Sequence, residues 1–501
     1  MAIETELKLR VTPAHLAKLK RHALLKAHQL ARPVTRRLYN VYFDTPELDL
    51  HQAAMALRLR RSGKQWLQTL KGGGFVQAGL HQRNEWEVPV AGEALDFSAA
   101  VTTEWDTLLP VAWREKLQPV FVTDFSRSSR MVDWQGAHIE VCMDSGHITA
   151  STRSHEICEL ELELKSGAPQ QLFSLALAIL DIVPVEIEMV NKAEYGFRLQ
   201  GNFIAQPYKH QPATLTSHDD LTQGLQAAIW SCLLHCQKNW RGAMGGTNPD
   251  FLHQVRVALR RLRVLLRFAY QLRSDEQLAR LSAEIADISV LLGAVRDWDV
   301  FIAQTLQPLR DAASQPDGFA ALVSAAHRQR TTCHAALLEQ AREMQSLILR
   351  FSIWMHGDYW QRAEKIAPPA QEFAAHKLNK LAHRFALTVG VLDENDAEEL
   401  HELRILAKKL RYSAEAFSGW FDDKYTGSFL NALAEVQQVL GLINDATVAH
   451  HLLDELLQKN ARHQQATVYT RNFIVRERSH LLDDLRKALQ YFDKQPIFWR
   501  A

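Results

Sequence analysis

The segment ETELKLRV, residues 4–11, places ionisable side chains at every second position. Alternate residues of a strand point to opposite faces, so one face of this segment carries Glu4, Glu6, Lys8 and Arg10 and the other is mostly apolar. Carboxylates bind hard divalent cations, and Lys and Arg bind phosphate oxygens. The row therefore fits either a solvated outer face, which is the commoner outcome, or a charged interior that binds a charged ligand.

The same alternation of charged and apolar residues recurs further along the chain. The charged positions are Arg58 and Arg60, then Arg83, Glu85 and Glu87, then Glu140 and Asp144, and finally Glu159, Glu161, Glu163 and Lys165. The charges are grouped by sign, because the last segment is acidic and the first is basic. A surface row of like charges would have little compensation, whereas separated acids and bases suit a metal–phosphate site.

The hydrophobic period divides the chain into two parts. A chain of 501 residues is too long for one core. The period is mostly two up to about residue 200, and it is 3.6 after a segment with Gly, Pro and polar residues. We therefore expect a β-rich domain over 1–201, a linker over 202–220 and an all-α domain over 221–501. The Gly-rich run at 71–74 predicts a hairpin turn, and without a GK[ST] ending it is not a P-loop.

Composition restricts the class of protein. The chain has 47% hydrophobic and 23% charged residues and a formal net charge of +1, which is typical of a globular protein and gives no global attraction to nucleic acid or membrane. Five cysteines without metal-ligand spacing indicate a reducing compartment, with Cys232 and Cys236 as buried thiols. With neither a secretory signal nor a long apolar run, we expect a cytoplasmic protein.

The motif Glu4-x-Glu6-x-Lys8 resembles the signature of the CYTH, or triphosphate tunnel metalloenzyme, superfamily. The further segments that resemble this superfamily follow in its order at residues 40–46, 55–60, 69–71, 83–87, 123–127, 140–146, 158–163 and 191–196. The resemblance covers about residues 1–200. It implies an eight-stranded antiparallel β tunnel with flanking helices, in which the charged row faces inward.

The same resemblance implies roles for individual residues. It places Glu4, Glu6, Glu159, Glu161 and Glu163 on catalytic Mg²⁺ or Mn²⁺, with Glu4, Glu6 and Lys8 as the catalytic set. It places Lys8, Arg58, Arg60, Lys71, Arg83, Arg127 and Lys192 on the triphosphate, with Arg130, Glu85, Glu87, Glu140 and Asp144 as further lumen residues. Fixed cations would stabilise charge that develops during phosphoryl transfer, and a metal would activate the attacking water.

The sequence departs from the superfamily pattern at three positions. Ala54 stands where the superfamily often has Gly, and Asn191 and Tyr195 replace the Ser and Arg that often flank the closing Lys. None of these changes removes a primary ligand, so activity is still expected.

The helical part contains an internal repeat with an offset of 148 residues. The segment HQVRVALRRLR at 253–263 corresponds to HELRILAKKLR at 401–411, and LGAVRDWDV at 292–300 corresponds to LGLINDATV at 440–448. Two motifs with one offset predict duplication, and we expect two similar helical bundles over about 221–350 and 370–495.

Each copy of the first motif has a basic helix face. At 100° per residue, His253, Arg256, Arg260 and Arg263 fall within about 80° of one another, as do His401, Arg404, Lys408 and Arg411. A lone basic helix is usually solvated, but repetition of the same register favours an anion-binding surface. A histidine metal site is disfavoured, because the neighbouring arginines would repel a cation.

This arrangement resembles the CHAD domain over about residues 221–495. The resemblance implies a helical, duplicated domain that binds inorganic polyphosphate, and the CYTH–CHAD order resembles that of bacterial inorganic triphosphatases. Arginine forks at several points along a flexible polyanion would bind with avidity.

The leading hypothesis is a metal-dependent inorganic triphosphatase that forms phosphate and pyrophosphate and whose helical domain binds polyphosphate. The alternatives are a nucleoside or thiamine triphosphatase, a cyclase, and a polyphosphate-binding or granule-associated protein with secondary catalysis. Neither nucleic acid nor a membrane is an expected partner, and the sequence does not indicate an oligomeric state.

Overall fold

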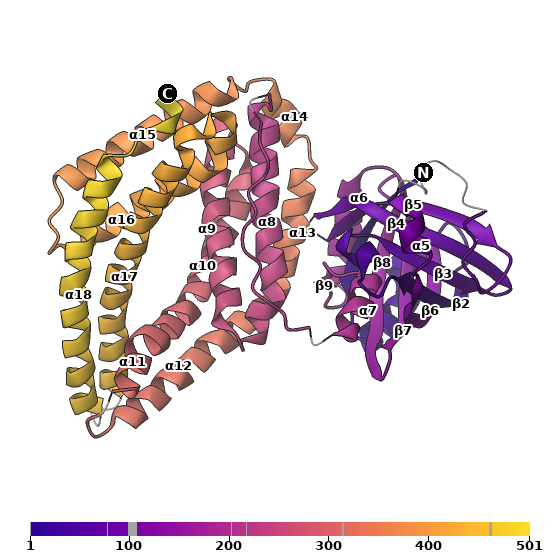
Figure 1. Ribbon diagram of the computed structural model, residues 1–501, viewed down its shortest axis with the longest axis horizontal. Coiled ribbons are helices and arrows are strands. Elements are labelled where there is room, and N and C mark those ends of the chain that lie inside the picture. The colour runs from indigo at the N-terminus through magenta and orange to yellow at the C-terminus, as the bar shows by residue number, and fades with distance from the viewer. Residues whose placement is uncertain are drawn as a thin grey trace. The chain divides into compact units, whose positions relative to one another are not determined.

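The computed structural model describes residues 2–77, 79–98, 108–201, 203–216, 218–312, 315–459 and 463–500 (Figure 1). The chain forms two compact units. We call Met1–Gln206 with Arg342–Gly357 the barrel unit, and Pro207–Ala341 with Asp358–Ala501 the helical unit.

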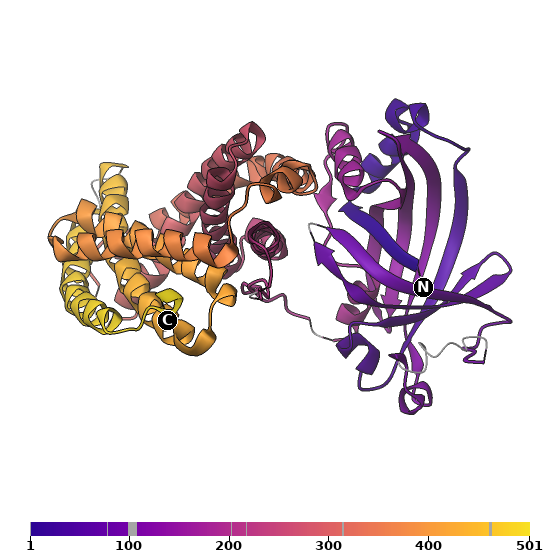
Figure 2. The same cartoon turned by 90° about the horizontal axis from the view of Figure 1, so that it is seen from above.

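The barrel unit is built on one closed antiparallel sheet (Figure 2). Its strands are β1 (Ala2–Arg10), β2 (Val34–Asp44), β3 (Ala56–Ser62), β4 (Gln65–Gln77), β5 (Leu80–Val90), β6 (Gln118–Trp134), β7 (Ala137–Ala150), β8 (Arg153–Ser166) and β9 (Glu186–Ile187). The order is β5-β4-β3-β2-β6-β7-β8-β1-β9, and β1 also pairs with β5, which closes the first eight strands into a barrel. This confirms the predicted tunnel fold.

Strand β1 lies between β5 and β8, and both of its faces are buried. Glu6 and Lys8 are 7% and 4% exposed, while Leu7 and Leu9 are fully buried. Cross-strand partners share a face, and Lys8 is opposite Glu161 of β8. The charged row therefore faces the inside of the barrel, and the leucines face the apolar layer outside it.

Helices of the barrel unit cover the outer face of the sheet. They are α1 (Pro13–Arg21), α2 (Ala23–Ala27), α3 (Asp49–Gln52), α5 (Val111–Arg114), α6 (Pro169–Leu180) and α7 (Lys192–Gln200). Helix α6 contacts β1 and β8 and buries six residues, among them Leu172, Phe173 and Ile179. Helix α7 contacts β6, β7 and β8, and its N-cap is Asn191, whose side chain accepts a hydrogen bond from the amide of Glu194.

The barrel unit also contains a helix from the part of the chain predicted to be the all-α domain. In α13 (Ala341–Met355) the Gln345 Oε1 accepts a hydrogen bond from the Ile187 amide at 3.0 Å. Arg342 donates to the carbonyl of Leu180 at 3.2 Å. The compact units thus divide the chain differently from the predicted boundaries, because α13 supports β9, which pairs with β1.

The predicted hairpin turn at 71–74 is wrong. These residues continue β4, with a register shift against β5 between Gly72 and Phe75. Gly73 and Gly74 have φ values of +65° and +85°, and a Cβ on Gly74 would lie 1.9 Å from the Gln82 carbonyl oxygen. The glycines therefore serve a bulge that brings two strands close together, not a reversal of the chain.

The helical unit is all-α over its described residues. Its helices are α8 (Leu221–Gly245), α9 (Pro249–Leu272), α10 (Glu276–Val300), α11 (Gln307–Arg310), α12 (Phe319–Glu339), α14 (Tyr359–Glu364), α15 (Ala370–Gly390), α16 (Ala397–Phe417), α17 (Thr426–Lys459) and α18 (Gln464–Asp493). A π-helical turn, η1 (Phe301–Leu306), follows α10, and short 3₁₀ turns occur at Ser418–Trp420, Asp423–Tyr425 and Phe498–Arg500. No helix among the described residues is long and apolar enough to span a membrane.

The internal repeat determines how the helices of this unit meet. The first copy of the two motifs lies on α9 and α10, and the second copy lies on α16 and α17. Helix α9 contacts α10, and α16 contacts α17 in the same way. The copies also meet, because α9 contacts α16 and α10 contacts α17. Four repeated segments are thus neighbours in space.

Helix α9 shows why its basic residues gather on one side. Pro249 occupies its first turn, and the Asn248 side chain caps it by accepting a hydrogen bond from the Asp250 amide. Its apolar residues, including Val255, Leu259 and Leu262, are buried at helical spacing. The basic residues between them are therefore held on the remaining face.

Candidate active site and candidate anion-binding site

The barrel encloses a charged cavity of about 530 Å³. Ten basic and seven acidic side chains line it. The basic ones are Lys8, Arg32, Arg36, Arg58, Arg60, Lys71, Arg83, Arg127, Lys165 and Lys192, and the acidic ones are Glu4, Glu6, Glu85, Glu87, Glu140, Glu161 and Glu163. The excess of positive charge suits a polyanionic ligand.

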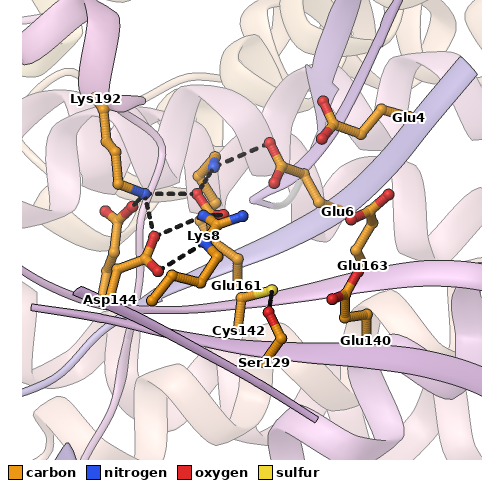
Figure 3. A network of polar contacts seen from close by, with 12 residues as sticks. Glu4, Glu6, Lys8, Ser129, Glu140, Cys142, Asp144, Glu161, Glu163 and Lys192 are labelled. Atoms are coloured by element: carbon orange, nitrogen blue, oxygen red, sulfur yellow. Dashed lines mark hydrogen bonds and ion pairs between the residues drawn. The ribbon is translucent and has the colours of Figure 1, made fainter. Parts of the chain in front are cut away.

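Next to this cavity, three carboxylates meet three cations, and Figure 3 labels Lys8, Asp144, Glu161 and Lys192 among them. Ligand oxygens of Asp144, Glu159 and Glu161 lie within 4.8 Å of one another. The cations that contact these carboxylates are Lys8, Arg127 and Lys192. The Lys192 Nζ lies 2.7 Å from Asp144 and 2.9 Å from Glu161. We call these six residues the closed network, because its charges balance internally.

Burial and charge act in opposite directions within the closed network. Burial raises the pKa of Glu159 to about 7, and the negative charge of Glu161 adds to this effect while Lys192 opposes it. Burial also opposes ionisation of Glu161, but Lys192 and Lys8 hold its pKa well below its usual range. The network therefore favours the ionised form of Glu161 more strongly than that of Glu159.

A second group of carboxylates lies beside the closed network, and Lys8 of the network contacts one of its members, Glu6, at 2.9 Å (Figure 3). It consists of Glu4, Glu6, Glu140 and Glu163. Burial raises the pKa of Glu163, and the negative charges of Glu4 and Glu140 add to the rise, while Lys165 opposes it. We call these four residues the acidic wall.

Among the described residues, the carboxylates close enough to hold one metal ion together are Asp144, Glu159 and Glu161, whereas the acidic wall has fewer cations per carboxylate. Lys71 contacts Glu4, Lys8 contacts Glu6, and Lys165 contacts Glu163 and Glu140, so three lysines face four carboxylates. Carboxylate oxygens are the ligands that Mg²⁺ and Mn²⁺ prefer. In the closed network a metal would add positive charge to three cations that already neutralise the carboxylates.

We call Arg58, Arg60, Lys71 and Arg83, which line the cavity, the basic wall, and their positive charge can receive an anion. Arg60 donates from Nε to Asn40 Oδ1 at 2.9 Å. Burial lowers the pKa of Arg60 to about 10, and the positive charges of Arg58 and Arg127 add to the decrease. Arg58 lies 3.4 Å from Glu85. An anion among these guanidinium groups would relieve their mutual repulsion.

Glu159 lies on the boundary of a different cavity. This second space, of about 500 Å³, is lined by Glu159 and Lys192, together with residues such as Arg10 and Glu188. Glu159 does not line the first cavity, whereas Lys192 lines both. Lys192 therefore borders both spaces.

In the helical unit, basic residues from the two repeats face one another. Burial lowers the pKa of Lys408 to about 6, and the positive charges of Arg404, Arg260 and Arg256 add to the decrease. Burial likewise lowers the pKa of Arg256 to about 10, with contributions from Arg260 and Arg404. Such mutual effects require the side chains of α9 and α16 to be near neighbours. We call Arg256, Arg260, Arg404 and Lys408 the basic cluster.

The basic cluster contains donors without acceptors. The Nε atoms of Arg260 and Arg404 are buried and have no hydrogen-bond partner among the described residues. A buried donor without a partner costs free energy that an anionic ligand would recover. Asp297 of α10 and Asp445 of α17 lie close enough to the cluster to act on its pKa values. The cluster is thus a candidate anion-binding site built from both repeats.

Models of two known families match the two parts of the chain. The CYTH domain model matches residues 2–194, and the CHAD domain model matches residues 227–454. The chain is a CYTH–CHAD tandem protein.

The relatives match different parts of this CYTH–CHAD chain. An inorganic triphosphatase of Haemophilus influenzae is 32% identical over 200 residues, which span 40% of this chain and 55% of the relative. An uncharacterized protein of Mycobacterium tuberculosis is 24% identical over 485 residues, 91% of this chain and 89% of the relative. The crystal structure of the CHAD domain from Ricinus communis covers 58% of this chain and 98% of its own, with 28% identity and a TM-score of 0.52.

The structure brings most of the sequence-predicted site residues of the CYTH domain into one cavity. The predicted site residues that line it are Glu4, Glu6, Lys8, Arg58, Arg60, Lys71, Arg83, Arg127, Glu161, Glu163 and Lys192. Glu159 lines the other cavity. Of the predicted further lumen residues, Glu85, Glu87 and Glu140 line the first cavity and Asp144 belongs to the closed network.

Sequence analysis did not identify Asn40 and Tyr42 as members of the CYTH site. Asn40 accepts a hydrogen bond from Arg60, and Tyr42 lines the cavity. Asn40 and Tyr42 alternate with apolar residues on β2, and this alternation is the sequence pattern that could have placed them in the site.

The predicted CHAD residues separate into two groups. His253 joins the basic cluster, since Arg296 and Arg260 act on its pKa, which burial lowers to about 4. His401 lies 3.2 Å from Asn444 of the second repeat motif. Arg263 is exposed, and Arg411 donates to Glu415 on its own helix at 2.9 Å. No contact among the described residues therefore places either residue in the basic cluster.

Proposed function

We propose that this protein hydrolyses inorganic triphosphate to phosphate and pyrophosphate in its CYTH domain, with Mg²⁺ or Mn²⁺, and binds polyphosphate through its CHAD domain. The observation that carries the first part is the pairing of an acidic wall with a basic wall in one cavity. The similarity to the triphosphatase of H. influenzae supports it over the CYTH region alone, because the matched segment spans about half of that relative.

The chain's own residues divide the work in this proposal. Glu4, Glu6, Glu140 and Glu163 would hold the divalent cation, and a bound cation of this kind neutralises phosphate charge and lowers the pKa of a bound water. Arg58, Arg60, Lys71 and Arg83 would bind the phosphate oxygens and stabilise the negative charge that develops on the leaving group. Asn40 would hold the Arg60 guanidinium in its place by accepting from Nε.

The closed network has a supporting role. Asp144 aligns the Arg127 guanidinium through two contacts of 2.8 and 2.6 Å. Lys8 lies 2.9 Å from Glu6, so it connects the network to the acidic wall. The network would therefore hold Lys8 and Arg127 rigidly at the end of the phosphate site.

A screen of substrates and metals tests the catalytic part of the proposal. Triphosphate, longer polyphosphates, thiamine triphosphate and ATP are each incubated with Mg²⁺ or Mn²⁺, and phosphate and pyrophosphate are measured separately. We expect the highest kcat/KM for triphosphate, with one phosphate and one pyrophosphate per turnover. Preference for ATP or thiamine triphosphate would favour an organic triphosphatase, and cyclic AMP among the products would favour a cyclase.

The polyphosphate part rests on the meeting of the two repeats at the basic cluster. Replacing Arg256, Arg260, Arg404 and Lys408 by Glu should abolish polyphosphate binding, and wild-type binding should weaken with added salt because it depends on screened charge. Triphosphate hydrolysis by this variant should be nearly unchanged, since the variant leaves the tunnel residues intact. Retained polyphosphate binding in the folded variant would show that these helix faces are solvated surfaces and not a binding site. Binding of polyphosphate without any triphosphate hydrolysis would favour a binding protein.

A further inference from the structure

Gly293 lies in the interior of α10, against a residue of the basic cluster on α9. An ideal Cβ on Gly293 would lie 2.7 Å from Arg256 Nη1, 3.8 Å from Cζ and 3.9 Å from Nη2. Real Cβ atoms do not approach heavy atoms this closely, so the guanidinium occupies space that only glycine leaves free. Glycine in a helix interior costs about 1 kcal/mol relative to alanine, which makes a function for Gly293 worth testing.

The internal repeat supplies a comparison within the same molecule. Gly441 occupies the equivalent position of the second copy, 148 residues later, in α17. A Cβ on Gly441 would meet no heavy atom within 4 Å. Two glycines with the same place in the repeat thus differ in one respect, because Gly293 alone makes room for a guanidinium of the basic cluster.

The place of the Arg256 guanidinium matters for the cluster. From its position against α10, Arg256 is a near neighbour of Arg260 on its own helix and of Arg404 and Lys408 on α16. An Ala side chain at 293 would displace the guanidinium from α10. The displaced group is the far end of a flexible side chain, so the helices themselves need not move.

We propose that Gly293 is a positioning residue for polyphosphate binding, which acts by letting the Arg256 guanidinium lie against α10 within the basic cluster. This inference rests on the proposed polyphosphate function of the helical unit. It assigns different roles to the two copies of the glycine, since Gly441 has no such contact.

The test compares Gly293→Ala, Gly441→Ala, Arg256→Ala and the double variant Gly293→Ala/Arg256→Ala in the full chain. Polyphosphate affinity is measured by isothermal titration calorimetry, and stability by thermal unfolding. Gly293→Ala should weaken binding about fivefold to tenfold, the size expected when one charged hydrogen bond is misplaced. Its Tm should stay the same or rise, because alanine is the better helix former. Gly441→Ala should likewise keep or raise Tm and should bind like the wild type.

The double variant shows whether Gly293→Ala weakens polyphosphate binding through Arg256. If Gly293 acts through Arg256, Gly293→Ala should have no further effect once Arg256 is Ala. The inference is wrong if Gly293→Ala binds polyphosphate like the wild type while Arg256→Ala binds it more weakly. It is also wrong if Gly293→Ala weakens binding by the same factor when Arg256 is already Ala, or if both glycine variants lose the same affinity. If the wild-type chain does not bind polyphosphate, the polyphosphate function fails and the inference fails with it.

Discussion

Arg127 and Asp144 stand directly opposite each other on β6 and β7, and their side chains form a two-point ion pair inside the barrel. Arg127 Nε lies 2.8 Å from Asp144 Oδ1, and Nη2 lies 2.6 Å from Oδ2. The Asp144 side chain is fully buried. The same carboxylate also contacts Lys192 at 2.7 Å, so two cations of the closed network depend on it.

Replacing Asp144 by Asn should therefore destabilise the protein strongly. The substitution leaves two buried cations with less compensation, and breaking a buried pair in this way costs about 3–5 kcal/mol in the free energy of unfolding. Chemical denaturation of the wild type and the variant measures the loss.

The matched control is a second pair with the same geometry in a different environment. Arg37 contacts Asp124 at 2.9 and 2.6 Å, but the Arg37 side chain is 79% exposed. Asp124→Asn should cost much less than Asp144→Asn, because water solvates the unpaired Arg37. Equal losses for the two variants would contradict a role for burial in the network.

Two adjacent arginines on β3 should differ in their effect on catalysis. Arg60 lines the cavity, whereas Arg61 is exposed, with its guanidinium 5.7 Å from the centre of the Tyr39 ring. Arg60→Ala should lower kcat/KM for triphosphate by about 10- to 100-fold, the cost of one or two charged hydrogen bonds to phosphate. The loss should be larger for triphosphate than for substrates with fewer phosphates. Arg61→Ala should be close to wild type, and equal losses for both variants would remove Arg60 from the substrate site.

Ala54 should be a site where glycine stabilises the protein. Its φ is +56°, in the left-handed region that costs residues other than glycine about 1–2 kcal/mol. Ala54→Gly should raise the free energy of unfolding by about 1 kcal/mol. Ala53, with φ −81°, is the control, and Ala53→Gly should lower stability. A loss of stability in both variants would show that the backbone at Ala54 carries no strain.

Polyphosphate binding should take up protons near neutral pH. Burial and the charges of Arg404, Arg260 and Arg256 lower the pKa of Lys408 to about 6, with Asp445 opposing them, so Lys408 is mostly neutral at pH 7.5. A bound polyanion favours the charged form and raises this pKa, so binding should take up about one proton and should strengthen as the pH falls toward 6.

Calorimetry in two buffers with different ionisation enthalpies measures this proton uptake. Long chains serve as the ligand, because their internal phosphates stay ionised over this pH range. Lys408→Arg should bind polyphosphate with little uptake, since arginine remains protonated. Uptake that is the same in the wild type and in Lys408→Arg would show that another group titrates.

Much of the barrel could be predicted from the sequence, but some of its elements have no recognisable sequence pattern. Strict alternation in β1 left a solvated face and a charged interior open, and the resemblance to the CYTH superfamily implied the inward charged face that the structure has. Strands β2 and β6 do not alternate regularly between charged and apolar residues, so the pattern with period two did not predict them. The first four residues of β2 are all exposed, and β6 contains the polar run Ser126–Arg130. Helix α13 has the same 3.6 period as its neighbours, so nothing in its pattern indicates that it belongs with the barrel.

Contacts within the sites depended on strand register and on helix packing. Asn40 can hold Arg60 only because the two are cross-strand partners of β2 and β3. The repeat offset predicted that two basic faces exist, and the contact between α9 and α16 is what makes them one cluster. Arg263 and Arg411 share the helical register of the cluster, but one is exposed and the other is paired with Glu415.

The central claim is that the inward charged row forms a metal-dependent site for triphosphate hydrolysis. The most direct measurement is phosphate release from triphosphate by the wild type, Glu6→Gln and Glu47→Gln across a titration of Mg²⁺ and Mn²⁺. Glu6 is buried in the tunnel and Glu47 is exposed on the surface, so the two substitutions remove the same charge from different environments. We predict that Glu6→Gln lowers kcat by about 100-fold or more in a protein that stays folded, while Glu47→Gln matches the wild type. Wild-type phosphate release by Glu6→Gln at every metal concentration would contradict the account.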